Sequence, residues 1–242
     1  MTVERGRIRV EPSGKRVRVY LGGRVVADSS HPLLVWESPR YPTYYFPADD
    51  VAQDLLVADG DIVHSPSRGD ARTFTVTVGS TQAPGAALRY DESPIDELRD
   101  HFRFDWDAMD SWFEEDEEVF VHVRDPYARI DVLASSRHVR VEVDGVTIAE
   151  SSSPRLLFET GLPVRCYLPK PHVRMDLLQS TDTVTRCPYK GVAEYWSVRT
   201  GDRVYRDCAW SYRMPLPESQ KIAGLVAFYK VDIYVDGVLQ DR

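Results

Sequence analysis

Apolar and charged residues alternate over short stretches of the chain, which is typical of β-strands with one buried face. In residues 139–143 three valines alternate with Arg140 and Glu142, and an Asp-Gly pair follows, a common turn between antiparallel strands. In the first half of the chain Gly22-Gly23 takes the place of that pair. The same pattern predicts further strands at residues 156–160, 164–168, 193–198 and 224–229.

Two stretches depart from the strand pattern. Pro169 and Pro171 end one predicted strand, and a single helical turn is expected over residues 172–178. Residues 94–113 combine charged side chains with spaced apolar ones, so part of this segment is expected to be helical. The predicted fold class is therefore all-β with a minor α component.

The chain contains two copies of one unit. Residues 17–78 align with residues 139–200 without a gap, and 20 of the 62 aligned pairs are identical, where unrelated sequences would give roughly four. We therefore expect two tandem antiparallel β domains. The first, diverged copy covers residues 7–128, and the second, with the complete set of motifs, covers residues 129–242.

Composition excludes several classes of protein. With 43% hydrophobic and 28% charged residues, the chain is typical of soluble globular proteins. It has no apolar run long enough to span a bilayer and no signal-peptide core at its N-terminus, so a cytoplasmic protein without a membrane partner is expected. Cys166, Cys187 and Cys208 have neither disulfide-framework nor zinc spacing, so neither a metal nor another cofactor is expected.

The charge of the chain is unevenly distributed. The net charge of −8 argues against nucleic acid as a partner. Residues 7–128 hold 13 basic and 23 acidic side chains, whereas residues 129–242 hold 16 basic and 14 acidic ones. An anionic small molecule would therefore meet less repulsion at the second copy.

The candidate catalytic groups are Glu159, Cys187 and Lys190. Glu159 ends an apolar stretch, where a carboxylate at a pocket mouth would suit acid/base chemistry; a structural ion pair with Arg174 or Arg155 is the equal alternative. Cys187 would be a nucleophile if Lys190, three residues later, favours its thiolate form. The alternatives are a buried core thiol, and a Lys190 that pairs with Asp176 or an anionic ligand.

The candidate ligand-binding groups lie nearby. Arg174 and Asp176 flank one residue and share a face if this segment is extended. Arg174 would then bind a carboxylate or phosphate while Asp176 orients a basic side chain. Aromatic side chains would form the pocket walls, the alternative being ordinary core packing. These aromatic candidates are Tyr189, Trp196, Trp210 and Tyr212.

The first copy keeps only part of this set. Glu37 and Asp54 correspond to Glu159 and Asp176. The other candidate positions differ, and the first copy there has Ala52 for Arg174, Ser65 for Cys187, Ser67 for Tyr189, Arg68 for Lys190 and Phe74 for Trp196. This pattern is expected if the fold was retained in both copies while the site changed in the first.

Residues 105–118 contain eight acidic side chains among fourteen residues. Clustered carboxylates can bind a cation, but the spacing matches no standard calcium loop. We therefore favour a solvated connector between the copies, with Trp106 and Trp112 packed against the core.

Several motifs of the second copy resemble one protein family. The motifs are ETGLPVRCYLP at residues 159–169, VRMDLL at 173–178, TxCPYKGxAxYW at 185–196 and GLVAFY at 224–229. Together they resemble the bacterial domain of unknown function 427 family over nearly all of residues 137–235, and the first copy is similar to a diverged member. The resemblance implies a small twisted β domain similar to the β-tent architecture. The zinc site of some β-tents is not carried over, because paired cysteines are missing.

This family is sometimes described as nucleotidyltransferase-like, but the residues do not support that chemistry. It requires a Gly-Ser or Gly-Gly turn that leads into an Asp-x-Asp pair for magnesium. No such pair follows Gly22-Gly23, and Asp105 and Asp107 lie far away in the acidic segment.

Three hypotheses of function remain. The leading one is a protein whose second copy binds a small anionic or polar-aromatic metabolite and has the groups for acid/base chemistry. The second is a non-enzymatic interaction module that presents sheet edges or the acidic residues 114–118 to a protein. The third and weakest is an enzyme that uses the Cys187 thiol.

Overall fold

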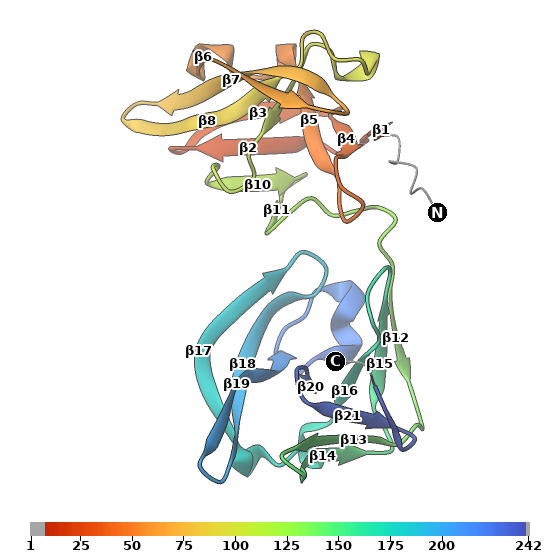
Figure 1. Ribbon diagram of the computed structural model, residues 1–242. Coiled ribbons are helices and arrows are strands. Elements are labelled where there is room, and N and C mark those ends of the chain that lie inside the picture. Colours follow the sequence, from red (N-terminus) through yellow and green to blue (C-terminus); the bar gives the residue numbers. More distant parts are fainter. Residues whose placement is uncertain (1–7, 241–242) are drawn as a thin grey trace. The chain divides into compact units, whose positions relative to one another are not determined.

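The computed structural model describes residues 8–240, and the chain divides into two compact units (Figure 1). The first unit ends at Asp125 and the second begins at Pro126. Within the described residues each unit has eleven strands, arranged as one seven-stranded and one four-stranded antiparallel sheet. The prediction of an all-β fold with two tandem domains is confirmed.

The second unit has the larger share of the candidate residues. Its seven-stranded sheet has the order β12 (Ile130–Ala134), β15 (Arg155–Glu159), β16 (Arg165–Leu168), β20 (Val226–Phe228), β19 (Arg203–Tyr212), β18 (Gly191–Thr200) and β17 (Leu178–Cys187). Its four-stranded sheet has the order β14 (Val146–Ser151), β13 (Val139–Val143), β21 (Asp232–Val235) and β22 (Val238–Leu239).

The first unit repeats this arrangement strand for strand. Its large sheet has the order β1 (Arg9–Pro12), β4 (Leu33–Trp36), β5 (Thr43–Pro47), β9 (His101–Phe104), β8 (Thr81–Arg89), β7 (Gly69–Val78) and β6 (Leu56–Ser65). Its small sheet has the order β11 (Glu117–Val119), β10 (Ser111–Glu114), β2 (Val17–Leu21) and β3 (Arg24–Ser29). The internal sequence repeat is therefore also a repeat of topology.

Two apolar layers hold the second unit together. The alternating valines of β13 are buried and pack with Val198 and Phe228 of the large sheet in one core cluster. Leu168 on β16 belongs to this cluster, whereas its neighbour Tyr167 belongs to a second cluster that includes Trp210. Because successive side chains of a strand point to opposite faces, the second cluster lies on the other face of the large sheet.

The helical segments are shorter than predicted, since every one among the described residues is a 3₁₀ turn. The predicted turn over residues 172–178 is two separate turns, η4 (Lys170–His172) and η5 (Met175–Leu177). In residues 94–113 only η3 (Asp96–Leu98) is helical. The strands β9 and β10 follow it, because every second residue there is buried, namely Phe102 and Phe104 in β9 and Trp112 and Glu114 in β10. The remaining turns are η1 (Ala48–Asp50), η2 (Gln53–Leu55) and η6 (Pro217–Ile222).

The prediction that residues 105–118 form a connector is wrong, because this segment includes β10 of the first unit's small sheet. Glu114 is buried there, 2.5 Å from Lys15 Nζ, and accepts a 3.0 Å hydrogen bond from Tyr44 Oη. Trp106 and Trp112 stack at 4.5 Å against the core, as predicted. Within residues 8–240 no three His, Cys, Asp or Glu side chains form a group that could hold a metal ion. No helix in this part of the chain is long and apolar enough to cross a membrane.

Candidate functional site

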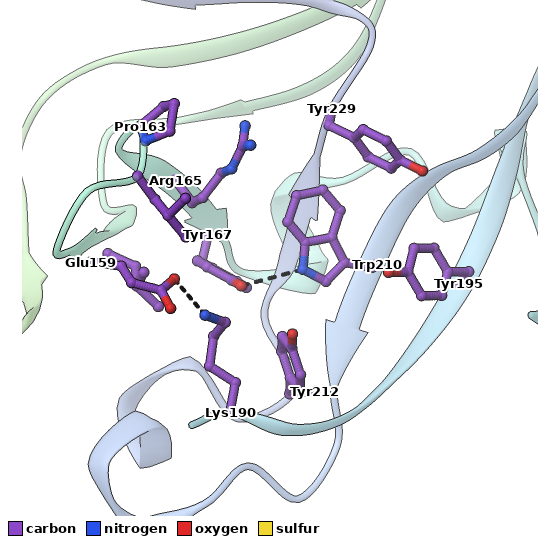
Figure 2. A pocket seen from close by; sticks show the side chains of 11 residues that line it. Glu159, Pro163, Arg165, Tyr167, Lys190, Tyr195, Trp210, Tyr212 and Tyr229 are labelled. Carbon is purple, nitrogen blue, oxygen red and sulfur yellow. Dashed lines mark hydrogen bonds and ion pairs between the residues drawn. The ribbon is translucent and has the colours of Figure 1, made fainter. Parts of the chain in front are cut away.

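A pocket of about 330 Å³ opens on the face of the second unit's large sheet that carries Tyr167 (Figure 2). Aromatic, charged and a few aliphatic side chains line it. They are Leu157, Glu159, Leu162, Pro163, Arg165, Tyr167, Lys190, Tyr195, Trp210, Tyr212 and Tyr229. Most belong to β15, β16, β18 and β19, so a folded sheet and not a loose loop positions them.

Strand register explains why residues distant in sequence meet here. Trp210 on β19 lies directly opposite Tyr195 on β18 and opposite Ala227 on β20, which in turn lies opposite Tyr167 on β16. Directly opposite residues of antiparallel strands share one face of the sheet. Arg165 lies two residues before Tyr167 on the same strand and therefore joins the same face.

Glu159 and Lys190 form an ion pair at one side of the pocket. Lys190 Nζ lies 2.5 Å from Glu159 Oε2, and the two side chains are only 11% and 10% exposed. Lys190 belongs to the turn between β17 and β18, and the turn ends at Gly191, whose φ of 92° favours glycine. Leu216 N donates a hydrogen bond of 3.2 Å to the Lys190 carbonyl and fixes this turn. Lys190 therefore pairs with Glu159 and not with Asp176, and Glu159 with neither Arg174 nor Arg155.

Aromatic side chains form the opposite walls. Trp210 Nε1 donates a 3.2 Å hydrogen bond to Tyr167 Oη, and the Trp210 ring meets the Tyr229 ring edge-on at 5.3 Å. Burial raises the pKa of Tyr167 and of Tyr212 above that of a free phenol, so both hydroxyls stay protonated at neutral pH. Tyr212 is 5% exposed, and its hydroxyl has no hydrogen-bond partner among the residues described.

Arg165 is the uncompensated charge of the pocket. It is half-buried, lines the cavity, and has no carboxylate within ion-pair distance in the described part of the chain. Figure 2 shows its guanidinium pointing away from the Glu159–Lys190 pair. Since Glu159 and Lys190 neutralise each other, the pocket carries a net positive charge that comes from Arg165.

Other predicted site residues lie elsewhere. Arg174 and Asp176 form a bidentate ion pair of 2.9 and 2.6 Å, with side chains 57% and 61% exposed, and neither lines the pocket. Trp196 follows Tyr195 on β18 and therefore faces the opposite side of the sheet, against the core between the two sheets.

Cys187 and Tyr189 border the pocket without lining it. Both are partly buried in the segment that leads to Lys190, and the Tyr189 carbonyl accepts a hydrogen bond from Ser219 Oγ at 3.4 Å.

Sequence reasoning thus found four of the lining residues, namely Glu159, Lys190, Trp210 and Tyr212. It placed Tyr195 only among general aromatic surface and missed Arg165, Tyr167 and Tyr229. The available indication for Arg165 was its two-residue spacing from Tyr167 within a predicted strand.

The family comparison agrees with the repeat. The family model of a domain of unknown function (DUF427) matches residues 9–115 and again residues 131–239. The chain belongs to the DUF427 family. The resemblance noted in the motifs is thereby confirmed, with both copies as family members. No curated protein shows significant similarity to the chain.

The first DUF427 domain has a closed network at the corresponding place. Arg68 Nη1 lies 2.6 Å from Glu37 Oε1 and donates a 2.9 Å hydrogen bond to Tyr45 Oη, which itself donates to Glu37 at 2.8 Å. Arg103 Nε lies 3.3 Å from the same carboxylate oxygen, and Arg68 packs over the Tyr90 ring. The two DUF427 domains therefore share a carboxylate and two tyrosines, but only the first surrounds the carboxylate with its own guanidinium groups.

Proposed function

We propose that the second DUF427 domain binds a small anionic metabolite in the pocket between Glu159, Arg165 and Trp210. The observation that carries this proposal is the lack of a counter-charge for Arg165, whose guanidinium lines the cavity. A guanidinium offers a fixed fork of donors that matches a carboxylate or phosphate. The anionic group of the ligand would supply the missing counter-charge.

The rest of the pocket supports a ligand with a flat or apolar body. The rings of Tyr195, Trp210 and Tyr229 give apolar walls, and the unpartnered Tyr212 hydroxyl is a further hydrogen-bonding group. The volume of about 330 Å³ lies at the lower end of the range of about 300–1,000 Å³ that is usual for small-molecule sites. These features favour a metabolite over a peptide or polymer.

The same pocket holds groups suited to proton transfer. Glu159 and Lys190 lie 2.5 Å apart, so either can exchange a proton with the other and with a ligand beside them. In this proposal Glu159 and Lys190 would also transfer protons to or from the bound ligand. A Glu159→Gln variant that still binds the ligand but loses turnover would identify it.

The test is a thermal-shift screen of carboxylates and phosphates with the full chain, followed by calorimetric titration of the compounds that stabilise it. Arg165→Met should weaken binding about 10- to 100-fold, the equivalent of losing a charged hydrogen bond of about 1.5–3 kcal/mol. Arg174→Met is the matched control, because Arg174 pairs with Asp176 outside the pocket and its loss should leave affinity unchanged. Equal affinity of wild type and Arg165→Met would refute the proposal, whereas loss in Arg174→Met alone would restore the role predicted for Arg174.

A further inference from the structure

The two domains differ at one position that projects into the pocket. In the first domain Arg103 on β9 lies directly opposite Tyr45 on β5. In the second domain Ala227 on β20 occupies this place, opposite Tyr167 on β16. Because opposite residues share a face, the Arg103 side chain projects where the second domain has only a methyl group.

The Glu37 carboxylate of the first domain therefore has more polar partners than the Glu159 carboxylate of the second. Glu37 Oε1 accepts a hydrogen bond from Tyr45 Oη and forms ion pairs with Arg68 and Arg103, and the Glu37 side chain is only 17% exposed. Glu159 uses Oε2 for Lys190, and its Oε1 has no partner among the described residues. The Glu159 side chain is 10% exposed and lines the cavity, so a donor on a ligand in the cavity would satisfy this oxygen.

A larger side chain in the second domain fills part of the space that corresponds to the Arg103 side chain of the first. Trp210 stands where the first domain has Leu88, opposite the same β20 position. The indole is held back by its hydrogen bond to Tyr167 Oη, and the cavity of about 330 Å³ remains in front of it. An aromatic ring beside a carboxylate is a favourable place for a cation, since the ring face attracts positive charge.

We propose that the ligand is a zwitterion, an amino or guanidino acid whose cationic nitrogen group binds Glu159 Oε1 in the place that Arg103 takes in the first domain. This inference rests on the proposed function, because it assigns the anionic end of the same ligand to Arg165. Glu159 and Arg165 form no ion pair with each other, and in Figure 2 the Arg165 guanidinium points away from the Glu159 carboxylate. A molecule with two opposite charges can therefore bind both.

The test uses calorimetric titration of the full chain with four probes. Arginine carries a carboxylate and cationic nitrogen groups, and agmatine lacks the carboxylate. The other two probes, 5-ureidopentanoate and pentanoate, have the carboxylate and no cationic group. Arginine should bind at least tenfold more tightly than each of the other three. Glu159→Gln should reduce the affinity for arginine to that for 5-ureidopentanoate, while Arg165→Met should reduce it to that for agmatine.

Two further variants separate a folding defect from a binding defect. Ala227→Arg combined with Trp210→Leu copies the arrangement of the first domain, and it should keep the melting temperature while abolishing arginine binding. Glu37→Gln removes the carboxylate of the first domain. It should change neither the affinity for arginine nor the stoichiometry of one arginine per chain.

The possible outcomes distinguish the two proposals. If pentanoate and 5-ureidopentanoate bind as tightly as arginine and Arg165→Met still loses affinity, the zwitterion is wrong while anion binding stands. If agmatine matches arginine and Arg165→Met has no effect, the proposed anion site itself fails, and the zwitterion with it. Absence of binding by all four probes also overturns the zwitterion.

Discussion

The Glu159–Lys190 ion pair gives the most direct test of how the pocket is built. Lys190→Met removes the ammonium and leaves a carboxylate that is only 10% exposed without a counter-ion. Breaking a buried pair in this way costs about 3–5 kcal/mol of folding free energy, because the remaining charge stays desolvated. Because Glu159 borders the open pocket, we expect a loss near the lower end of this range, about 3 kcal/mol.

Urea unfolding followed by tryptophan fluorescence measures this loss. With a typical urea dependence of about 2 kcal/mol per molar, a loss of about 3 kcal/mol lowers the midpoint of the second domain by about 1.5 M. The double variant Glu159→Gln with Lys190→Met removes both charges and should recover most of that loss, since no unpaired charge remains.

The exposed Arg174–Asp176 pair is the matched control in the same domain. Its side chains are 57% and 61% exposed, so Arg174→Met should not measurably change the midpoint. The reasoning is refuted if Lys190→Met shifts the midpoint no more than Arg174→Met does. It is also refuted if the double variant is as unstable as Lys190→Met alone.

Three further predictions concern the same domain. Gly191→Ala should lower stability by about 1–2 kcal/mol in urea unfolding, because the φ of 92° strains a residue with a side chain. Burial raises the pKa of the Tyr212 hydroxyl in the folded state, so Tyr212 contributes its full stabilisation below about pH 10 and loses it as the pH rises above that value. In the Tyr212→Phe variant the melting temperature should therefore fall less between pH 9 and pH 11 than in the wild type. Cys187→Ser should leave affinity for any ligand of the pocket within twofold in calorimetry, since the thiol borders the rings without lining the cavity.

The fold was accessible from sequence because its determinants are local and occur twice. The valine alternation of residues 139–143 gave a strand, and β13 has this strand with alternate side chains buried. The acidic residues 105–118 were misjudged because charge density was given more weight than alternation. Trp112 and Glu114 occupy alternate positions of β10, and both are buried.

The site was only partly accessible, because it depends on strand order. Glu159 and Lys190 meet although they are 31 residues apart, and β15 is separated from β18 by three other strands of the sheet. Neither the spacing of residues nor the composition of the chain predicts the order of the strands in the sheet. Arg174 and Trp196 were chosen for their chemistry, yet a 3₁₀ turn exposes the former and strand alternation turns the latter to the other face.

The two domains differ in how the polar groups around the shared carboxylate are partnered. In the first domain Arg68 reaches Glu37 and Tyr45 at once, so the polar groups of that place satisfy one another. The shorter Lys190 reaches only Glu159. Lys190 and Ala227 stand where the first domain has Arg68 and Arg103, and Glu159 Oε1 and the Tyr212 hydroxyl have no partner among the described residues. The Arg165 guanidinium, which also has none there, stands where the first domain has Thr43. Polar groups that line a cavity gain hydrogen bonds when a complementary ligand binds there, and such a ligand stabilises the folded domain. This is the physical reason for assigning the proposed ligand to the second domain.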